Sequence, residues 1–281
     1  MKILKAYAEI DLGQIHYLSS ENANKPPLLL LHQAPSSSEM FRDLMGFLGR
    51  DFYVIAPDFP GFGQTDQLVD KVSVRGISLI IASFLNSLKI SGVRVFGHHS
   101  GASVAVQLSH HFPDLVSRLI LSGPPSLTKE QQASLRESLV RPFGISEEGE
   151  ALLESWSLLR AKGRNVPLEI SYREFCLQLS AGESVSELYN AVFNHNFRNQ
   201  LQCLSQPVLV CAGRNDVMYP YLDDAFKILK QGKKIIVGDA CGYVCETHTR
   251  DLANIIFEFC HQKAPDQVAL SDGQFEHGLE N

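Results

Sequence analysis

The five residues at positions 97–101, Gly-His-His-Ser-Gly, constrain the fold of this chain more than any other feature. They follow a short strand pattern at 93–96, Val-Arg-Val-Phe, and they precede a helical pattern over 102–111. A sharp strand-to-helix turn strains its apex residue and crowds the positions two residues before and after it. Only His99 has glycine at both of those positions. The sequence therefore predicts that His99 occupies the apex and that Ser100 comes one residue later.

Short apolar runs and helical patterns alternate through much of the chain. The first two runs are joined by Leu12-Gly13, which indicates an antiparallel hairpin. The later alternation favours a mostly parallel sheet that is flanked by helices and joined by right-handed crossovers. Eight strands are expected, at residues 7–11, 14–18, 28–31, 53–56, 93–96, 119–121, 208–212 and 235–237.

The pattern changes near residue 126, after which no strand is indicated until about residue 205. Thr128 and Gln131 predict a capping box at the start of one helix, and Ser146 predicts the cap of a second helix that ends before Gly163. We therefore expect an all-helical cap inserted into an α/β core. The expected divisions are a core of 1–125 and 206–262, a cap of 126–205, and a flexible tail of 263–281.

Composition excludes several classes of protein. The 281 residues are 44% hydrophobic and 20% charged, as in ordinary globular proteins, and the net charge of −6 argues against a nucleic-acid partner. No apolar stretch approaches the roughly 18 residues of a membrane span, and the start lacks the apolar segment of a signal peptide, so cytoplasmic localisation is expected. The six cysteines are expected to be reduced thiols, and the irregular Cys241, Cys245 and His248 spacing favours packing over a metal site.

Several motifs occur in an order that resembles the α/β-hydrolase superfamily, specifically the cap-bearing branch with epoxide hydrolases, haloalkane dehalogenases and C–C bond hydrolases. Residues 32–35, His-Gln-Ala-Pro, are similar to the His-Gly-x-Pro of the family's oxyanion loop. Residues 95–108 match its nucleophile turn and following helix, and residues 208–216 match the strand and loop that carry the acid. The resemblance covers nearly the whole chain except the tail, and it implies the α/β-hydrolase fold.

The resemblance also implies roles for individual residues. The family's acid falls on Asp216, its nucleophile position on His99, and its oxyanion-hole N–H groups on Ala34 and Ser100. The position of its catalytic histidine falls on Gly242. A complete Ser-His-Asp set is therefore absent, as is an aspartate nucleophile.

We hypothesise that His99 reaches Asp216 with one ring nitrogen and faces the oxyanion hole with the other. Asp216 would fix the tautomer and stabilise the imidazolium. Because an ordinary histidine titrates near 6.5, such a dyad suits general-base catalysis near neutral pH. The base would activate water against a small apolar ester, lactone or C–C ketone, or take a proton from the substrate; direct attack by His99 is the less favoured variant. No metal or organic cofactor is implied.

The sequence is also compatible with other functions. The same fold and residues would also suit a catalytically silent small-molecule binding protein, or a lyase or isomerase that uses the same base. Candidate substrate contacts are Gln33, His195 and Tyr243, whereas His32 is expected to order its own loop and His98 to pack under the turn. The sequence does not set the identity of the substrate or the oligomeric state.

Overall fold

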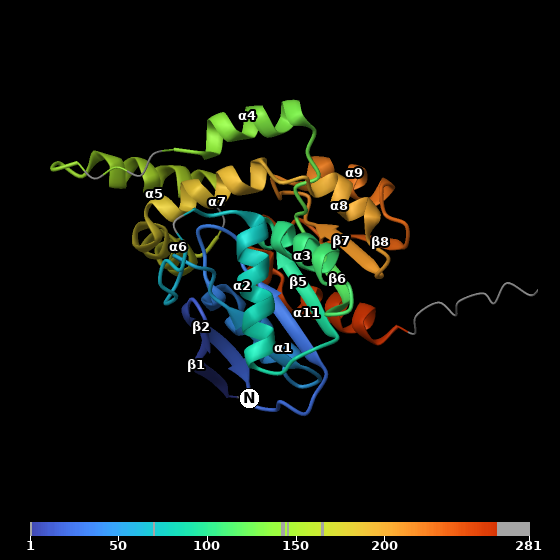
Figure 1. The fold of residues 1–281 in the computed structure, drawn as a ribbon. Helices are drawn as coiled ribbons and strands as arrows, with labels where there is room; N and C mark the ends of the chain where they lie inside the picture. Colours follow the sequence, from blue (N-terminus) through green and yellow to red (C-terminus); the bar gives the residue numbers. More distant parts are fainter. Residues whose placement is uncertain (1, 70, 142–143, 145, 164–165, 263–281) are drawn as a thin grey trace, which may run out of the picture.

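The computed structural model describes residues 2–69, 71–141, 144, 146–163 and 166–262 of the chain (Figure 1). The tail that we expected at 263–281 lies outside the described residues.

An eight-stranded, mostly parallel sheet forms the centre of the chain, as the sequence predicts. The strand order is β1-β2-β4-β3-β5-β6-β7-β8, and only the β1–β2 and β2–β4 pairs are antiparallel. Each expected run corresponds to a strand. The strands are β1 (Ile3–Ile10), β2 (Gly13–Ser20), β3 (Pro27–Leu31), β4 (Tyr53–Pro57), β5 (Val93–His98), β6 (Val116–Ser122), β7 (Val208–Ala212) and β8 (Gly232–Ile236).

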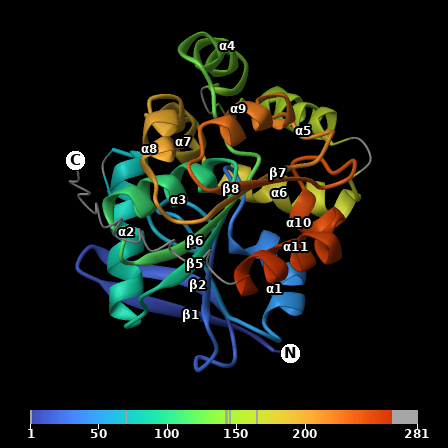
Figure 2. The same cartoon turned by 90° about the vertical axis from the view of Figure 1, so that its right-hand side faces the viewer.

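Helices cover both faces of the sheet, which explains why the leucines of β3 follow one another without interruption. In β3, Leu29 and Leu31 pack into one hydrophobic core, and Leu28 and Leu30 pack into another. Figure 2 shows α2 and α3 on one side of the sheet, and α1 and α11 on the other. These four helices are α1 (Arg42–Leu48), α2 (Val74–Ser87), α3 (Ser100–His111) and α11 (Thr249–His261).

In the described part of the chain between β6 and β7 there are five helices, and they lie above the sheet in Figure 1. The first of them begins with the predicted capping box between Thr128 and Gln131. The second begins at Glu150 after Gly149, so the expectation that Ser146 caps it was wrong. The five are α4 (Lys129–Leu139), α5 (Glu150–Lys162), α6 (Leu168–Ala181), α7 (Glu183–Phe193) and α8 (Phe197–Cys203). We call this part the α4–α8 segment.

The remaining helical elements lie in loops beside the sheet. Two are short 3₁₀ turns, η1 (Ser38–Phe41) after β3 and η2 (Tyr219–Tyr221) after β7. The other two are α9 (Leu222–Lys227) and α10 (Val244–Thr247).

Candidate functional site

The turn between β5 and α3 places His99 at its apex. His99 has φ +47° and ψ −109°, a conformation that non-glycine residues rarely adopt. A Cβ added at Gly97 would lie 2.5 Å from the Gly101 carbonyl oxygen, and one added at Gly101 would overlap the carbonyl oxygen of Leu31. Both glycines are thus required by close backbone contact. Ser100, one residue further on, is the first residue of α3.

His99 forms a hydrogen-bonded pair with Asp216, which lies in the loop after β7. The Nε2 atom of His99 is 3.0 Å from Oδ1 and 2.9 Å from Oδ2 of the carboxylate. Asp216 also accepts a 2.7 Å hydrogen bond from the Met218 N–H. Burial raises the pKa of this carboxyl, but the charge and hydrogen bond of His99 outweigh it and lower the pKa of Asp216 to about 2. Asp216 is therefore an ionised partner that fixes the His99 ring.

The other imidazole of the turn, His98, is a neutral support beneath His99. Its Nε2–H donates to the Gly242 carbonyl at 2.9 Å, which leaves Nδ1 to accept from the Ser122 hydroxyl at 3.0 Å. Burial, together with the nearby charge of His99, lowers the pKa of His98 to about 3. The two rings stack with centroids 4.1 Å apart. His98 therefore packs under the turn, as expected.

Gly242, where the resemblance would place a histidine, borders the ring of His99. A Cβ added at Gly242 would lie 3.4 Å from Cε1 of His99. The Gly242 carbonyl accepts a second hydrogen bond, of 3.2 Å, from Nε2 of Gln33. The His99 ring thus occupies the neighbourhood that a missing loop imidazole leaves free.

Of the two backbone N–H groups that we expected in the oxyanion hole, those of Ala34 and Ser100, the first is already hydrogen-bonded in the structure. The Ala34 N–H donates a 2.7 Å hydrogen bond to the hydroxyl oxygen of Ser100. That N–H is therefore occupied, because the side chain one residue past the apex reaches back to the loop after β3. Ser100 heads α3, where a backbone N–H has no acceptor within the helix. Its N–H and its hydroxyl hydrogen have no acceptor among the described residues, so both can donate to a ligand.

A cavity of about 800 Å³ separates this end of the sheet from the α4–α8 segment. His99, Ser100 and the candidate substrate contacts Gln33 and Tyr243 line it. Much of the remaining lining is apolar and comes from α4 to α7. It includes Leu135, Leu152, Leu159, Leu179, Val185 and Phe193.

His195 is placed differently from our expectation of a substrate contact. It lies just past α7, is buried, and is absent from the cavity lining. Its Nε2–H donates to Oε1 of Gln200 on α8 at 2.7 Å. Burial lowers the pKa of His195 to about 4, so the ring is neutral. Its hydrogen bond links the end of α7 to α8. His32 matches its expected role: Nδ1–H donates to the Gln33 carbonyl, and Nε2 accepts from the Phe59 N–H, both at 2.9 Å.

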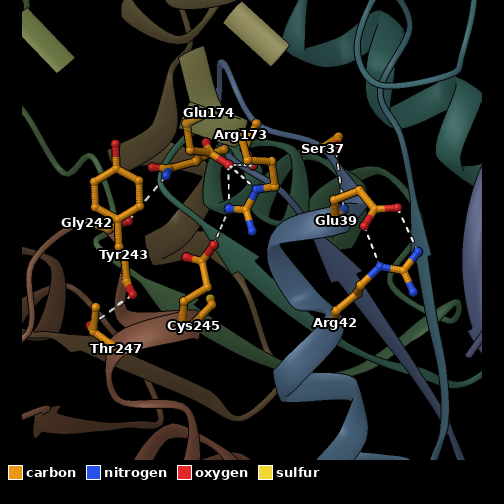
Figure 3. Close-up of polar contacts among 12 residues, drawn as sticks. Ser37, Glu39, Arg42, Arg173, Glu174, Gly242, Tyr243, Cys245 and Thr247 are labelled. Atoms are coloured by element: carbon orange, nitrogen blue, oxygen red, sulfur yellow. Dashed lines mark hydrogen bonds and ion pairs between the residues drawn. The ribbon is translucent and has the colours of Figure 1, made fainter. Parts of the chain in front are cut away.

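An ionic cluster of Arg173, Glu174 and Glu246, of which Glu174 lines the cavity, was not predicted from the sequence. Arg173 Nη2 and Glu174 Oε1, both of α6, are bonded at 2.6 Å (Figure 3). The same guanidinium bonds Glu246 of α10. The Ser36 hydroxyl donates to Glu174 at 2.9 Å. The cluster therefore ties α6 to α10 and to the loop after β3. No sequence signal could have indicated it, because its members come from three distant segments.

The pKa of Glu246 predicts a pH-dependent stability. Burial raises that pKa from 4.5 to about 7 against the opposing effect of Arg173. Because the folded state binds this proton more tightly than the unfolded chain, its contribution is complete below about pH 4.5 and is lost as pH rises through 7. The loss amounts to about 3 kcal/mol. Glu246→Gln should remove that part of the dependence, as measured by urea unfolding at pH 5 and pH 8. If wild type and variant lose the same stability between these two pH values, the raised pKa is wrong.

Among the described residues, no group of three or more His, Cys, Asp or Glu side chains is arranged to hold a metal ion. Cys245 is buried, and the nearby His248 lies 3.1 Å from Asp239 through Nε2 and Oδ1. In the part of the chain that the structure describes, no helix is long and apolar enough to cross a membrane.

This chain is similar to known proteins in sequence and in structure. A family model described as the alpha/beta hydrolase fold matches residues 26–142. An uncharacterized protein of Mycobacterium tuberculosis is 36% identical over 105 residues, which are 37% of this chain and 31% of that protein. The 3-oxoadipate enol-lactonase 2 of Acinetobacter baylyi is 22% identical over 213 residues, or 75% of this chain and 79% of the relative. The solved enol-lactonase from Burkholderia xenovorans LB400 has a TM-score of 0.76 at 16% identity and covers 92% of this chain and 100% of that chain.

These matches agree with the strand order and with the helices on both faces of the sheet. The chain has the α/β-hydrolase fold, and its residues 26–142 match the family model of that description. It spans about a third of the length of the Mycobacterium relative.

Proposed function

We propose that this chain is a hydrolase-type enzyme that cleaves a small carbonyl compound with His99 as general base. The observation that carries the proposal is the contact of His99 Nε2 with both oxygens of Asp216, at 2.9 and 3.0 Å, on the border of the cavity. Enol-lactonases among the similar proteins favour a lactone or a related ester as the substrate. The α4–α8 segment acts as the cap over the substrate, and the β5–α3 turn takes the place of a nucleophile elbow.

Under this proposal the two ring nitrogens of His99 have different tasks. Nε2–H donates to Asp216, so Nδ1 is the basic nitrogen, and it has no hydrogen-bond partner among the described residues. In the proposed reaction Nδ1 takes a proton from water while the water oxygen bonds to the carbonyl carbon. The ionised Asp216 stabilises the imidazolium that forms. Collapse of the tetrahedral intermediate breaks the bond to the leaving oxygen or carbon, which takes the proton back from Nδ1.

Asp216→Asn provides the direct test of this dyad. An amide in place of the carboxylate removes the charge and permits the wrong tautomer of His99, so turnover should fall by at least about 10²-fold. The measurement is a screen of esters, lactones and β-diketones with the wild type, followed by kinetics of the variant on whichever compound is cleaved. Equal turnover by the two proteins would contradict the proposal.

A second candidate function is a small-molecule binding protein without turnover. The hydrogen bond from the Ala34 N–H to Ser100 favours it, because that bond occupies a donor that an oxyanion would otherwise use. The same screen separates the two candidates. Tight binding of a carbonyl compound, with no cleavage of any ester, lactone or β-diketone, would favour the binding protein.

A further inference from the structure

The part of the cavity wall that α6 contributes carries a carboxyl group that takes no part in the His99–Asp216 pair. Glu174 lines the cavity, and only 1% of its surface is exposed to solvent. It lies beside Arg173 in Figure 3. A carboxyl buried this deeply requires hydrogen-bonding partners, because its removal from water is costly.

The donors that reach Glu174 from the described residues all meet the same carboxylate oxygen. Oε1 accepts from the Ser36 hydroxyl at 2.9 Å, from Arg173 Nε at 3.1 Å and from Arg173 Nη2 at 2.6 Å. Oε2 has no donor among the described residues. One acceptor oxygen of a buried, cavity-lining carboxyl therefore has no partner.

The surroundings hold this oxygen in a fixed position. The Arg173 guanidinium also bonds Glu246, and the Ser36 hydroxyl fixes the carboxyl from the loop after β3. A preorganised, charge-balanced acceptor of this kind binds a donor without first having to be ordered. Because much of the cavity lining is apolar, a hydrogen bond from a ligand to Glu174 would be stronger there than in water.

We infer that Oε2 of Glu174 accepts a hydrogen bond from a hydroxyl or N–H group of the ligand. The cavity then takes a carbonyl compound that carries a hydrogen-bond donor, with an apolar chain or ring between the two groups. This inference rests on the proposed function only for the position of the carbonyl at His99. It also refines the purely apolar substrate that the sequence led us to expect.

The experiment uses pairs of simple ketones that ordinary hydrolysis leaves intact. The full-length protein is titrated calorimetrically with linear 2-alkanones of six to ten carbons and with their terminally hydroxylated counterparts. At one or two chain lengths the hydroxyketone should bind about tenfold more tightly than its partner, as expected for a hydrogen bond to a charged group. Glu174→Gln should remove most of that preference and leave binding of the plain ketone unchanged. Glu174→Asp keeps the charge but has a shorter side chain, so its oxygens lie further from the ligand, and it should also reduce the preference for the hydroxyketone. This variant replaces Glu174→Gln in the test if the glutamine variant does not fold.

Glu246→Gln is the matched control, because Glu246 bonds the same guanidinium but is absent from the cavity lining. It should retain the hydroxyl preference. The inference is overturned if the wild type shows no preference at any length, if the preference survives both Glu174 variants, or if Glu246→Gln removes it equally. Ester turnover is measured separately, so a hydroxyl preference without turnover would overturn the proposed hydrolysis and leave the Glu174 site standing.

Discussion

Replacement of His99 by alanine is expected to lower kcat/KM for a cleaved ester or lactone by about 10²- to 10⁴-fold, the usual contribution of a general base. The variant removes the ring that contacts Asp216. Alanine, like histidine, has a Cβ, so the positive φ at position 99 remains strained. Its folding is checked by thermal unfolding, and its kinetics are measured on the substrate found in the screen. Residual activity within threefold of the wild type would contradict the role of His99 as base.

Ser100→Ala is the matched control, since it changes the adjacent residue on the border of the same cavity. If Ser100 were the nucleophile, this variant would be inactive. Under the His99 proposal the loss should stay below about tenfold, because removal of the hydroxyl frees the Ala34 N–H to donate to the substrate oxygen instead. The ratio of the two variants therefore separates an imidazole base from a displaced serine nucleophile.

Much of the fold could be predicted because it depends on short-range patterns. The uninterrupted leucines of β3 follow from burial on both faces of the sheet, and the position of His99 follows from two glycines that the backbone requires. The pattern was weaker at the edge of the sheet. The strand that we expected at 235–237 spans Gly232–Ile236 in the structure. Its first three residues, Gly-Lys-Lys, are exposed and give no apolar signal in the sequence, so the prediction began too late.

The chemistry of the site was only partly predictable. The approach of His99 to Asp216 follows from where parallel strands end, because both residues come from loops at the same edge of the sheet. The hydrogen bond from Ala34 to Ser100 depends on a rotamer, and the Arg173–Glu174–Glu246 cluster depends on side chains from α6 and α10 that reach each other. Neither leaves a periodic trace in the sequence. A motif thus predicts which backbone positions meet, whereas side-chain packing decides which donors stay free.

Gly123→Ala should disable the site without altering any of its polar residues. Gly123 follows β6 with φ +57°, and a Cβ there would overlap Cδ2 and Nε2 of His99 and lie 3.3 Å from Oδ2 of Asp216. The ring must therefore move away from the carboxylate. Because a displacement of about 1 Å in a catalytic group can cost about 10²-fold in rate, we expect a loss of at least that size in kcat/KM.

Gly92→Ala separates this effect from backbone strain. Gly92 also has a positive φ, of +61°, but a Cβ there meets nothing within 4 Å. In both alanine variants the left-handed conformation should lower the free energy of unfolding by roughly 1–2 kcal/mol. Only Gly123→Ala should also lose turnover, because only there does the new methyl group reach His99. If the two variants keep equal activity, the contact between His99 and Asp216 is not what the reaction requires, and the proposed dyad fails even if His99 itself proves essential.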